Sequence, residues 1–392
     1  MHLIFFFLCL YLASFAKALN VEVRAPAAIL INADTGVVLF EKHAHIPAYP
    51  ASTTKIATAL YVLDQGMELT QMTTVSREAL RAKPTQKNRE VAPWWHESDG
   101  TMMGLKVGER ISLEALLHGL MLISGNDAAN VIAEMAAGSV PLFMERLNEY
   151  LKEIGCKNTQ FRNPHGLTDV NHSSTAYDLA LITSRALKFP QFRKIVSTLR
   201  YEKGETNKQP KGEIKLTNPL LKPASRHYYA KAIGVKTGYT QAAKNTLVAA
   251  AEYEGRTLIA VLLGCETRED RYEDAKRLFD TAFAEVKTTR RLMGAEQVFA
   301  KEILGSRKNV KASLITPLSI SFFPSEEPEC KAALHWKVEE VPIHKGQKVG
   351  EIHILSMDDR LLEKGDLFAL EEMKGSLLYI LKRKIGQLVG LE

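Results

Sequence analysis

Strand-like segments lie near both ends of residues 27–283, and helical segments fill the stretch between them. Residues 27–32 are an apolar run typical of a buried strand, and the turn Asp34-Thr35-Gly36 leads into a second run at 37–40, which predicts a hairpin. Helical signals mark four later segments: 50–64, 111–137 with a break at 124–126, 141–154 and 175–186. Three β-rich runs and a last helix follow, at 235–239, 246–253, 257–264 and 270–283. This order predicts one mixed sheet flanked by helices, with the two ends of the segment meeting in it.

The pattern changes near residue 287. From there to residue 374, short strands alternate with turns such as Lys345-Gly346-Gln347 and Met357-Asp358-Asp359, which is typical of a small all-β domain. A chain of 392 residues is also too long for one ordinary hydrophobic core. The sequence therefore predicts an α+β domain over residues 19–286 and an all-β domain over residues 287–374.

Residues 1–18 differ from the rest of the chain. Leu3 to Phe15 is an apolar run without charge, and Ala16-Lys17-Ala18 after it resembles a signal-peptide cleavage site. The run is shorter than the ~20 apolar residues that a membrane-spanning helix needs. We therefore expect a cleaved signal peptide and an exported mature chain, with an uncleaved anchor or a buried strand as the alternatives.

Residues 375–392 predict an amphipathic helix. At 100° per residue its leucines and isoleucines fall on one broad arc, Lys382, Arg383 and Gln387 lie mostly opposite, and Lys384 intrudes on the arc. Such a helix fits a membrane interface, with its basic residues facing anionic headgroups. Packing of the helix on the all-β domain is the alternative interpretation.

Composition excludes several classes of function. The formal net charge of +6 is spread along the chain, whereas a nucleic-acid-binding protein is expected to carry a dense basic face. Cys9 lies in the predicted signal peptide, and Cys156, Cys265 and Cys330 lack the spacing of a disulfide framework or a metal site, so we expect small buried side chains. The histidines show no metal spacing either, and we predict neither a metal nor a cofactor.

The string Ser52-Thr53-Thr54-Lys55 places a hydroxyl and an amine at i and i+3 on one helix face. With Ser52 near the helix N-terminus, its backbone N–H can help to stabilise an oxyanion. Lys55 can act as a base only if burial and neighbouring positive charge lower its pKa. Alone, the pattern also fits a Ser N-cap with an exposed lysine.

Two further strings carry polar groups that suit the same chemistry. Ser124-Gly125-Asn126 follows an apolar helix that would bring it inside the domain, where a substrate amide and a lysine could bond it. Lys236-Thr237-Gly238 lies on a predicted strand, and the glycine permits close approach of another backbone or a ligand. Taken singly, these strings also fit a helix–helix turn and an exposed strand end.

Together and in this order, the three strings are the signature of penicillin-binding proteins and serine β-lactamases. Four strings, at 50–55, 124–129, 158–167 and 234–240, resemble more closely the D-alanyl-D-alanine carboxypeptidases, which are low-molecular-mass penicillin-binding proteins of peptidase family S11. The resemblance runs from about residue 25 to residue 285. The β-rich segment and terminal helix resemble the rest of that family in layout.

The resemblance implies roles for the reacting groups. Ser52 would attack the carbonyl between the two terminal D-alanines of a peptidoglycan stem peptide, and Lys55 would accept its proton. Ser124 would relay a proton to the departing D-alanine, and Asn126 would bond the substrate amide. Water would then deacylate the enzyme, and β-lactam antibiotics would trap it as covalent inhibitors.

The resemblance also implies a substrate-binding strand. Lys236 would tune the site, Thr237 would bind the terminal carboxylate of the pentapeptide, and Arg271 would help to hold that carboxylate. The backbone N–H groups of Ser52 and Tyr239 would form the oxyanion hole, and Gly238 would belong to the substrate-binding residues of the strand. Such an enzyme would lie in the periplasm, peripherally bound to the outer face of the cytoplasmic membrane.

Three further functions are compatible with the sequence. A class A β-lactamase needs an E-x-x-L-N element, and Glu145-Arg146-Leu147-Asn148 is one residue short of it. Endopeptidase action on cross-links and a role as a non-catalytic envelope scaffold are the second and third. His165 lies in a Pro-His-Gly turn without a carboxylate partner and is expected to be structural. Residues 81–97 fit either a loop at the rim of the cleft or a surface excursion.

Overall fold

The computed structural model describes residues 10–12, 18–84, 91–97 and 100–389. These residues form two compact units, one over residues 18–284 and one over residues 285–392 to which residues 10–12 belong. The sequence pattern placed the boundary between the two domains between residues 286 and 287. Each unit has its own hydrophobic core.

The first unit contains a five-stranded sheet in the order β3-β2-β10-β9-β8. Its strands are β2 (Ala27–Asn32), β3 (Val38–Lys42), β8 (Ala232–Thr240), β9 (Lys244–Tyr253) and β10 (Arg256–Cys265). The predicted hairpin and the meeting of the two chain ends are confirmed, because β2 pairs with both β3 and β10. The prediction of a mixed sheet was wrong, since every pairing is antiparallel. Short turns join β2 to β3 and β8 through β10, and such turns connect only antiparallel strands.

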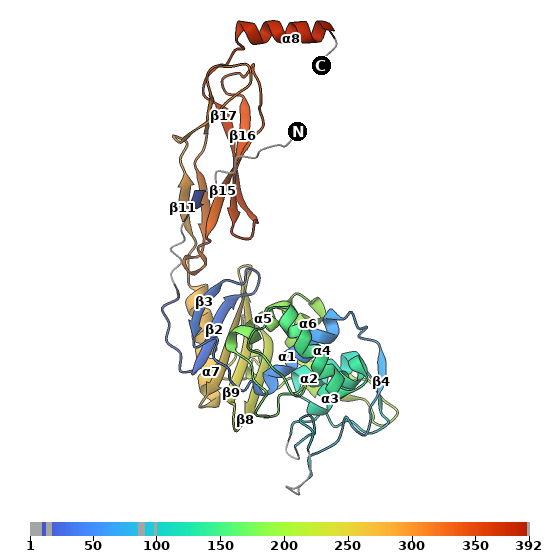
Figure 1. Ribbon diagram of the computed structural model, residues 1–392. Coiled ribbons are helices and arrows are strands. Elements are labelled where there is room, and N and C mark those ends of the chain that lie inside the picture. The colour runs from blue at the N-terminus through green and yellow to red at the C-terminus, as the bar shows by residue number, and fades with distance from the viewer. Residues whose placement is uncertain (1–9, 13–17, 85–90, 98–99, 390–392) are drawn as a thin grey trace. The chain divides into compact units, whose positions relative to one another are not determined.

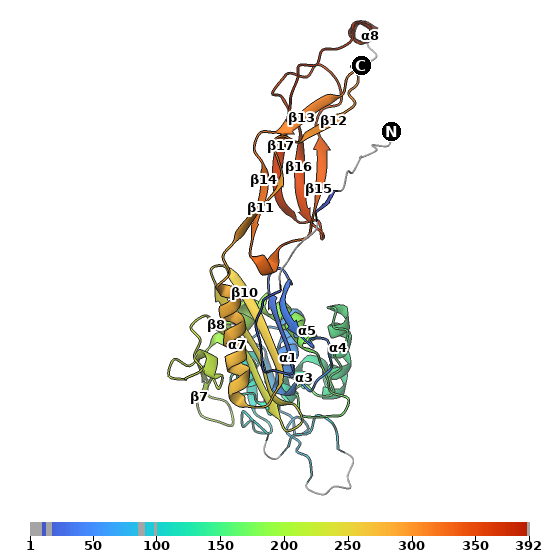
Figure 2. The ribbon, with the colours of Figure 1, turned by 90° about the vertical axis from the view of Figure 1, so that its left-hand side faces the viewer.

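Helices cover both faces of this sheet (Figures 1 and 2). On one face α7 (Arg268–Phe283) packs against β9 and β10, and on the other α5 (Ala176–Leu187) packs against β2 and β10. The remaining helices are α1 (Lys55–Asp64), α2 (Leu113–Leu122), α3 (Asn126–Ala137), α4 (Val140–Glu153) and α6 (Pro190–Ser197). The predicted break at 124–126 is therefore confirmed.

The helix expected over residues 50–64 begins as a short 3-10 helix, η1 (Ala51–Thr54), and continues as α1. Every residue of α1 except Asp64 is buried, so this helix runs through the core. Its first residue is nevertheless a lysine. A buried lysine needs polar partners, because desolvation of an unpaired charge is costly.

Short elements complete the first unit. They are β4 (Met72–Thr74), β5 (Arg110–Ser112), β6 (Arg200–Lys203), β7 (Gly212–Lys215) and the 3-10 helix η2 (Pro219–Leu221). The three cysteines outside the predicted signal peptide are free and buried, as expected.

The second unit is built mainly of antiparallel strands. They are β11 (Thr288–Met293), β12 (Val298–Lys301), β13 (Val310–Leu314), β14 (Leu318–Phe322), β15 (Cys330–Trp336), β16 (Lys348–Ser356) and β17 (Leu361–Ala369). One sheet has the order β1-β15-β16-β17-β13-β12, and β11 pairs separately with β14. The predicted all-β character and both predicted turns are present. A short 3-10 helix, η3 (Pro324–Glu326), precedes β15.

Helix α8 (Leu377–Val389) follows the strands. Leu377, Leu378, Leu381 and Ile385 are exposed on it, with Leu377 at 82%. None of the helices within the described residues is long and apolar enough to cross a membrane. At the other end of the chain, β1 (Leu10–Leu12) pairs with β15. The rest of the predicted signal peptide up to residue 17 lies outside the described residues.

Candidate active site

Ser52 lies in η1, which contacts β8 and β9 and leads into the buried helix α1. The residue before it, Ala51, adopts φ = 50°, a left-handed conformation that costs a non-glycine residue free energy. This bend lies immediately before Ser52, at the start of η1. Lys55 begins α1 three residues later, and its Nζ lies 3.0 Å from Ser52 Oγ. The i, i+3 pairing expected from the sequence is therefore formed.

The Lys55 amine has two further partners. Its Nζ lies 2.7 Å from Asn126 Oδ1 and 2.6 Å from the carbonyl oxygen of His165. Both of these oxygens can only accept hydrogen bonds. A neutral amine has two N–H groups, so donation to these two oxygens leaves its lone pair for the hydroxyl proton of Ser52. The geometry therefore suits a general base.

Burial, and then the positive charge of Lys236, hold the pKa of Lys55 well below its usual range, against the opposing effect of the Asp127 carboxylate. The amine is completely buried. The two conditions that the sequence required of Lys55 are thus met in the folded chain. A lowered pKa makes it easier for the lysine to lose its proton, and the neutral amine can then accept one from Ser52.

The turn between α2 and α3 supplies the second string. Asn126 is buried and contacts Lys55, whereas Ser124 is only half-buried. Ser124 adopts φ = 67°, and its hydroxyl makes no hydrogen bond to another described residue. The structure therefore brings Asn126 to the reacting pair. The proton relay through Ser124 stays a prediction.

Strand β8 carries the third string beside η1. Lys236 is buried, and its Nζ donates to the carbonyl of Thr237 at 2.8 Å. Burial, and then the charge of Arg271, lower the pKa of Lys236 to about 7. A Cβ on Gly238 would lie 2.9 Å from the backbone nitrogen of Ser52 and 2.4 Å from Thr246 Oγ1. The expectation of a close backbone approach at Gly238 is therefore confirmed.

Tyr239 and Arg271 differ in burial. The Tyr239 side chain is 65% exposed at the end of β8. Arg271 is buried on α7, and its Nη1 donates to the carbonyls of Gly238 at 2.8 Å and Thr246 at 3.0 Å. The guanidinium thus holds β8 and β9 together below the site. Direct contact between Arg271 and a substrate carboxylate stays a prediction.

His165 is structural, as expected. Its Nδ1 accepts a hydrogen bond from the backbone N–H of Leu167, and its Nε2 lies 3.1 Å from the carbonyl of Trp94. Because the carbonyl can only accept, the proton resides on Nε2 and the ring is neutral. Burial, and then the charge of Lys55, hold the pKa of His165 well below its usual range.

Three supporting residues were not predicted from the sequence. Asp127 is buried and accepts hydrogen bonds from the backbone N–H groups of Met103, Gly104 and Leu105, which fixes the loop before β5 beside Asn126. Thr54 and His172 are bonded to one another beneath Ser52. Thr54 and Asp127 lie within strings that the sequence singled out, whereas His172 lies outside them. The partners of all three side chains are set by the fold.

The loop 81–97 is tied to the frame of the site at its C-terminal end. The carbonyl of Trp94 accepts from His165 and also from Asn130 Nδ2 at 2.9 Å, and His96 is buried. Residues 85–90 lie outside the described residues. The described part of the loop is therefore bonded to residues that flank the site, and its place at the rim of a cleft stays a prediction.

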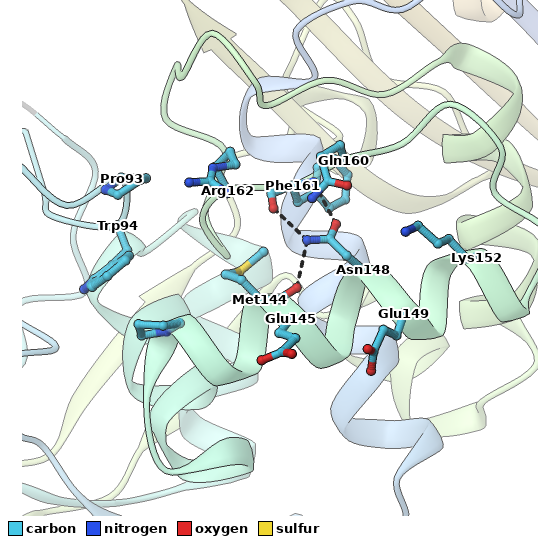
Figure 3. Close-up of a pocket in the computed structure, with 11 residues that line it drawn as sticks. Pro93, Trp94, Met144, Glu145, Asn148, Glu149, Lys152, Gln160, Phe161 and Arg162 are labelled. Carbon is cyan, nitrogen blue, oxygen red and sulfur yellow. Dashed lines mark hydrogen bonds between the residues drawn. The ribbon is translucent and has the colours of Figure 1, made fainter.

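A cavity of about 360 Å³ lies between α4 and residues 160–162 (Figure 3). Glu145 and Asn148, the pair considered as a β-lactamase element, both line it, whereas its described lining includes neither Ser52 nor Lys55. The Asn148 amide is engaged by the carbonyls of Met144 and Phe161, as the dashed lines show. Glu145 and Asn148 therefore belong to a cavity distinct from the reacting pair.

Known proteins match both units of the chain. The family model of the D-alanyl-D-alanine carboxypeptidases, peptidase S11, matches residues 14–267, and that of the penicillin-binding protein 5 C-terminal domain matches residues 288–375. The D-alanyl-D-alanine carboxypeptidase DacF of Bacillus subtilis is 33% identical over 93% of this chain and 90% of its own length. DacA of Haemophilus influenzae is 28% identical over 90% of this chain and 86% of its own. The crystal structure of penicillin-binding protein 5 from Haemophilus influenzae covers 91% of this chain and 99% of its own, with 27% identity and a TM-score of 0.62.

Proposed function

The chain belongs to the D-alanyl-D-alanine carboxypeptidase family, peptidase S11, and from this premise we propose that it removes the terminal D-alanine from peptidoglycan stem peptides through an acyl-enzyme on Ser52. The observation that carries the proposal is the buried Lys55 amine, 3.0 Å from Ser52 Oγ and with two acceptors for its remaining protons. This arrangement suits activation of a serine hydroxyl without a histidine.

Acylation begins with attack of Ser52 Oγ on the carbonyl carbon between the two D-alanines. The hydroxyl proton passes to Lys55 Nζ, and the carbonyl oxygen becomes an oxyanion that the backbone N–H groups of Ser52 and Tyr239 stabilise. The proton then reaches the amine of the departing D-alanine through Ser124, and the C–N bond breaks. Water hydrolyses the resulting ester and returns the proton to Ser52.

Strand β8 is suited to hold the substrate. It is the last strand of its sheet, so one side of its backbone has no neighbouring strand among the described residues. An extended peptide can add to such an edge through main-chain hydrogen bonds. Thr237 would then bond the terminal carboxylate, Asn126 the substrate amide, and Lys236 would add positive charge.

Release of D-alanine from a pentapeptide ending in D-Ala-D-Ala tests the proposal. We expect release by the purified protein and a lasting covalent adduct with a fluorescent penicillin. A β-lactamase would shed the adduct within seconds, and a scaffold would form none. Release only from cross-linked dimers would indicate an endopeptidase. The location of Glu145 and Asn148 in a separate cavity argues against a β-lactamase.

We further propose that residues 1–18 are a cleaved signal peptide and that the mature chain works at the outer face of the cytoplasmic membrane. The apolar run from Leu3 to Phe15 and the small residues after it support export. A peptidoglycan substrate requires the same location. The exposed leucines of α8 support attachment to the membrane surface rather than insertion across it.

Charge on the apolar face of α8 is expected to abolish membrane binding. Leu377 and Leu381 are 82% and 59% exposed, and burial of each leucine in a bilayer interface contributes about 1.5 kcal/mol or more. Leu377→Glu combined with Leu381→Glu should therefore lower the partition coefficient by at least about 100-fold. Co-sedimentation with vesicles containing anionic lipid measures it.

The matched control for this membrane test is Ile315→Glu. Ile315 is 68% exposed in the same unit but lies outside α8. This variant should bind vesicles as the unchanged protein does. Equal binding of the α8 double variant would refute the attachment through α8 and would leave the proposed enzymatic activity untouched.

A further inference from the structure

A chain of buried hydrogen bonds ends on the peptide group that joins Ala51 to Ser52. Thr54 Oγ1 lies 2.9 Å from the carbonyl oxygen of Ala51 and 2.9 Å from Nε2 of His172. The other ring nitrogen of His172, Nδ1, lies 3.0 Å from the backbone nitrogen of Arg162. Thr54 and His172 are almost completely buried, at 0% and 1% exposure. None of the catalytic roles described above involves this series of hydrogen bonds.

The direction of each hydrogen bond in this chain is determined. The Arg162 N–H can only donate, so His172 Nδ1 accepts. The Ala51 carbonyl can only accept, so the single Thr54 hydroxyl proton is directed to it. His172 Nε2 must then carry a proton and donate to Thr54 Oγ1. Burial, and then the charges of Lys55 and Arg162, lower the pKa of His172 to about 3, so the ring stays neutral and this pattern persists at physiological pH.

The last bond of the chain orients the Ser52 N–H. In a planar trans peptide group, the carbonyl oxygen and the N–H of the following residue point in opposite directions. Holding the Ala51 carbonyl toward Thr54 therefore turns the Ser52 N–H to the opposite side. A Cβ on Gly238 would lie 2.9 Å from that nitrogen, so the N–H lies beside strand β8, which carries Tyr239.

Packing alone does not determine this orientation. Ala51 has φ = 50°, a conformation that an alanine adopts only at a cost in free energy, so the peptide group needs a restraint. Gly166 lies against the same group, where a Cβ would be 1.9 Å from the Ala51 oxygen. Gly166 fills the space around the carbonyl but offers its oxygen no directed hydrogen bond. The Thr54 hydroxyl adds a directed side-chain bond to the backbone bonding of the 3-10 helix η1, and His172 fixes the orientation of that hydroxyl.

We propose that His172 and Thr54 are positioning residues that orient the Ser52 N–H as an oxyanion donor, which deepens the proposed function and rests on it. Neither side chain touches the substrate. Both act through the Ala51–Ser52 peptide group, so their loss should slow acylation without weakening the binding that precedes it.

The test compares Thr54→Val, which removes the hydroxyl at nearly constant volume, with Thr54→Ser, which keeps it. The rate constant for acylation by a penicillin should fall about 10- to 100-fold in the valine variant, since loss of a whole oxyanion donor costs about 10²–10³-fold. The serine variant should stay close to the unchanged protein. The dissociation constant of the preceding complex should be unchanged. Equal acylation rates in the valine variant and the unchanged protein would overturn the proposal.

The matched control is Thr183→Val. Thr183 is fully buried in α5, and its hydroxyl donates to the carbonyl of Leu179 at 2.7 Å, far along the chain from η1. Loss of this similar bond should lower the melting temperature as Thr54→Val does and leave the acylation rate unchanged. An equal rate loss in both variants would show general destabilisation and would refute the specific role.

A second readout separates orientation of the donor from loss of structure. Sulfur accepts hydrogen bonds more weakly than oxygen, so a thiocarbonyl acyl donor profits less from an oriented N–H than its carbonyl counterpart. The preference of the unchanged protein for the carbonyl donor should shrink about tenfold in Thr54→Val and in His172→Phe, whose ring keeps the stack on Phe161. An undiminished preference in both variants would overturn the inference. Failure of the unchanged protein to acylate at all would instead refute the proposed function.

Discussion

Ser52→Ala is expected to abolish both D-alanine release and covalent labelling by penicillin. The alanine lacks the only atom that can form the acyl bond in the proposed mechanism, and the Lys55 amine would then have no hydroxyl to activate. Loss of the nucleophile in a serine hydrolase costs on the order of 10⁶-fold in kcat, so we expect a loss of at least about 10⁴-fold here. Release of D-alanine from the pentapeptide and mass spectrometry of the penicillin adduct measure the two effects.

The control for this substitution is Ser197→Ala. Ser197 ends α6, and among the described residues its hydroxyl bonds only carbonyls of its own helix. This variant should hydrolyse and label like the unchanged protein. The melting temperature of Ser52→Ala should lie close to that of the unchanged protein, because Ser52 is only half-buried. An undiminished adduct in Ser52→Ala would show that another residue is the nucleophile.

Lys55→Arg is expected to lower the acylation rate by about 10³-fold or more. Arginine keeps its positive charge but cannot give up its proton at any relevant pH, so it cannot accept the proton of Ser52. General-base assistance contributes typically 10²–10⁴-fold. The substitution therefore distinguishes a base from a fixed positive charge. Stopped-flow acylation by a chromogenic β-lactam measures the rate.

The pH dependence of acylation has a definite sign in the unchanged protein. Because the pKa of Lys55 is lowered by burial and by Lys236, the base is neutral above that pKa and protonated below it. The rate should rise with pH through the lowered pKa of Lys55, and this limb should vanish in Lys55→Arg. Lys222→Arg, at an exposed lysine, is the matched control and should keep the limb. Near-normal acylation by Lys55→Arg would refute the role of Lys55 as base.

Much of the fold could be predicted because periodicity and turn signals are local. The hairpin of β2 and β3, the break between α2 and α3, and the run of β8 to β10 all follow from residues close together in the chain. Strand direction was mistaken, because it depends on which connections are short. Helix α6 was missed, since eight residues hold too few turns for a clear periodic signal.

The residues of the site likewise divide into those that local sequence could identify and those that it could not. The strings around Ser52, Asn126 and Lys236 could be recognised, because each holds its reacting groups within a few residues. The guanidinium of Arg271 bonds the carbonyls of Gly238 and Thr246, and its expected contact with the substrate stays a prediction. His172 could not be found from its neighbours in the chain. Its partner Thr54 becomes adjacent only when the segment after α4 folds over η1.

The sequence by itself determined that Ser52 and Lys55 face the same way one helical turn apart, because that spacing is a property of the local backbone. Only the tertiary structure decided that the lysine can act as a base. Burial in the core, the charge of Lys236 on β8, and the acceptors on Asn126 and His165 come from segments distant in the chain. A pKa depends on every charge and dipole within a few ångströms, and folding decides which of these groups lie that close.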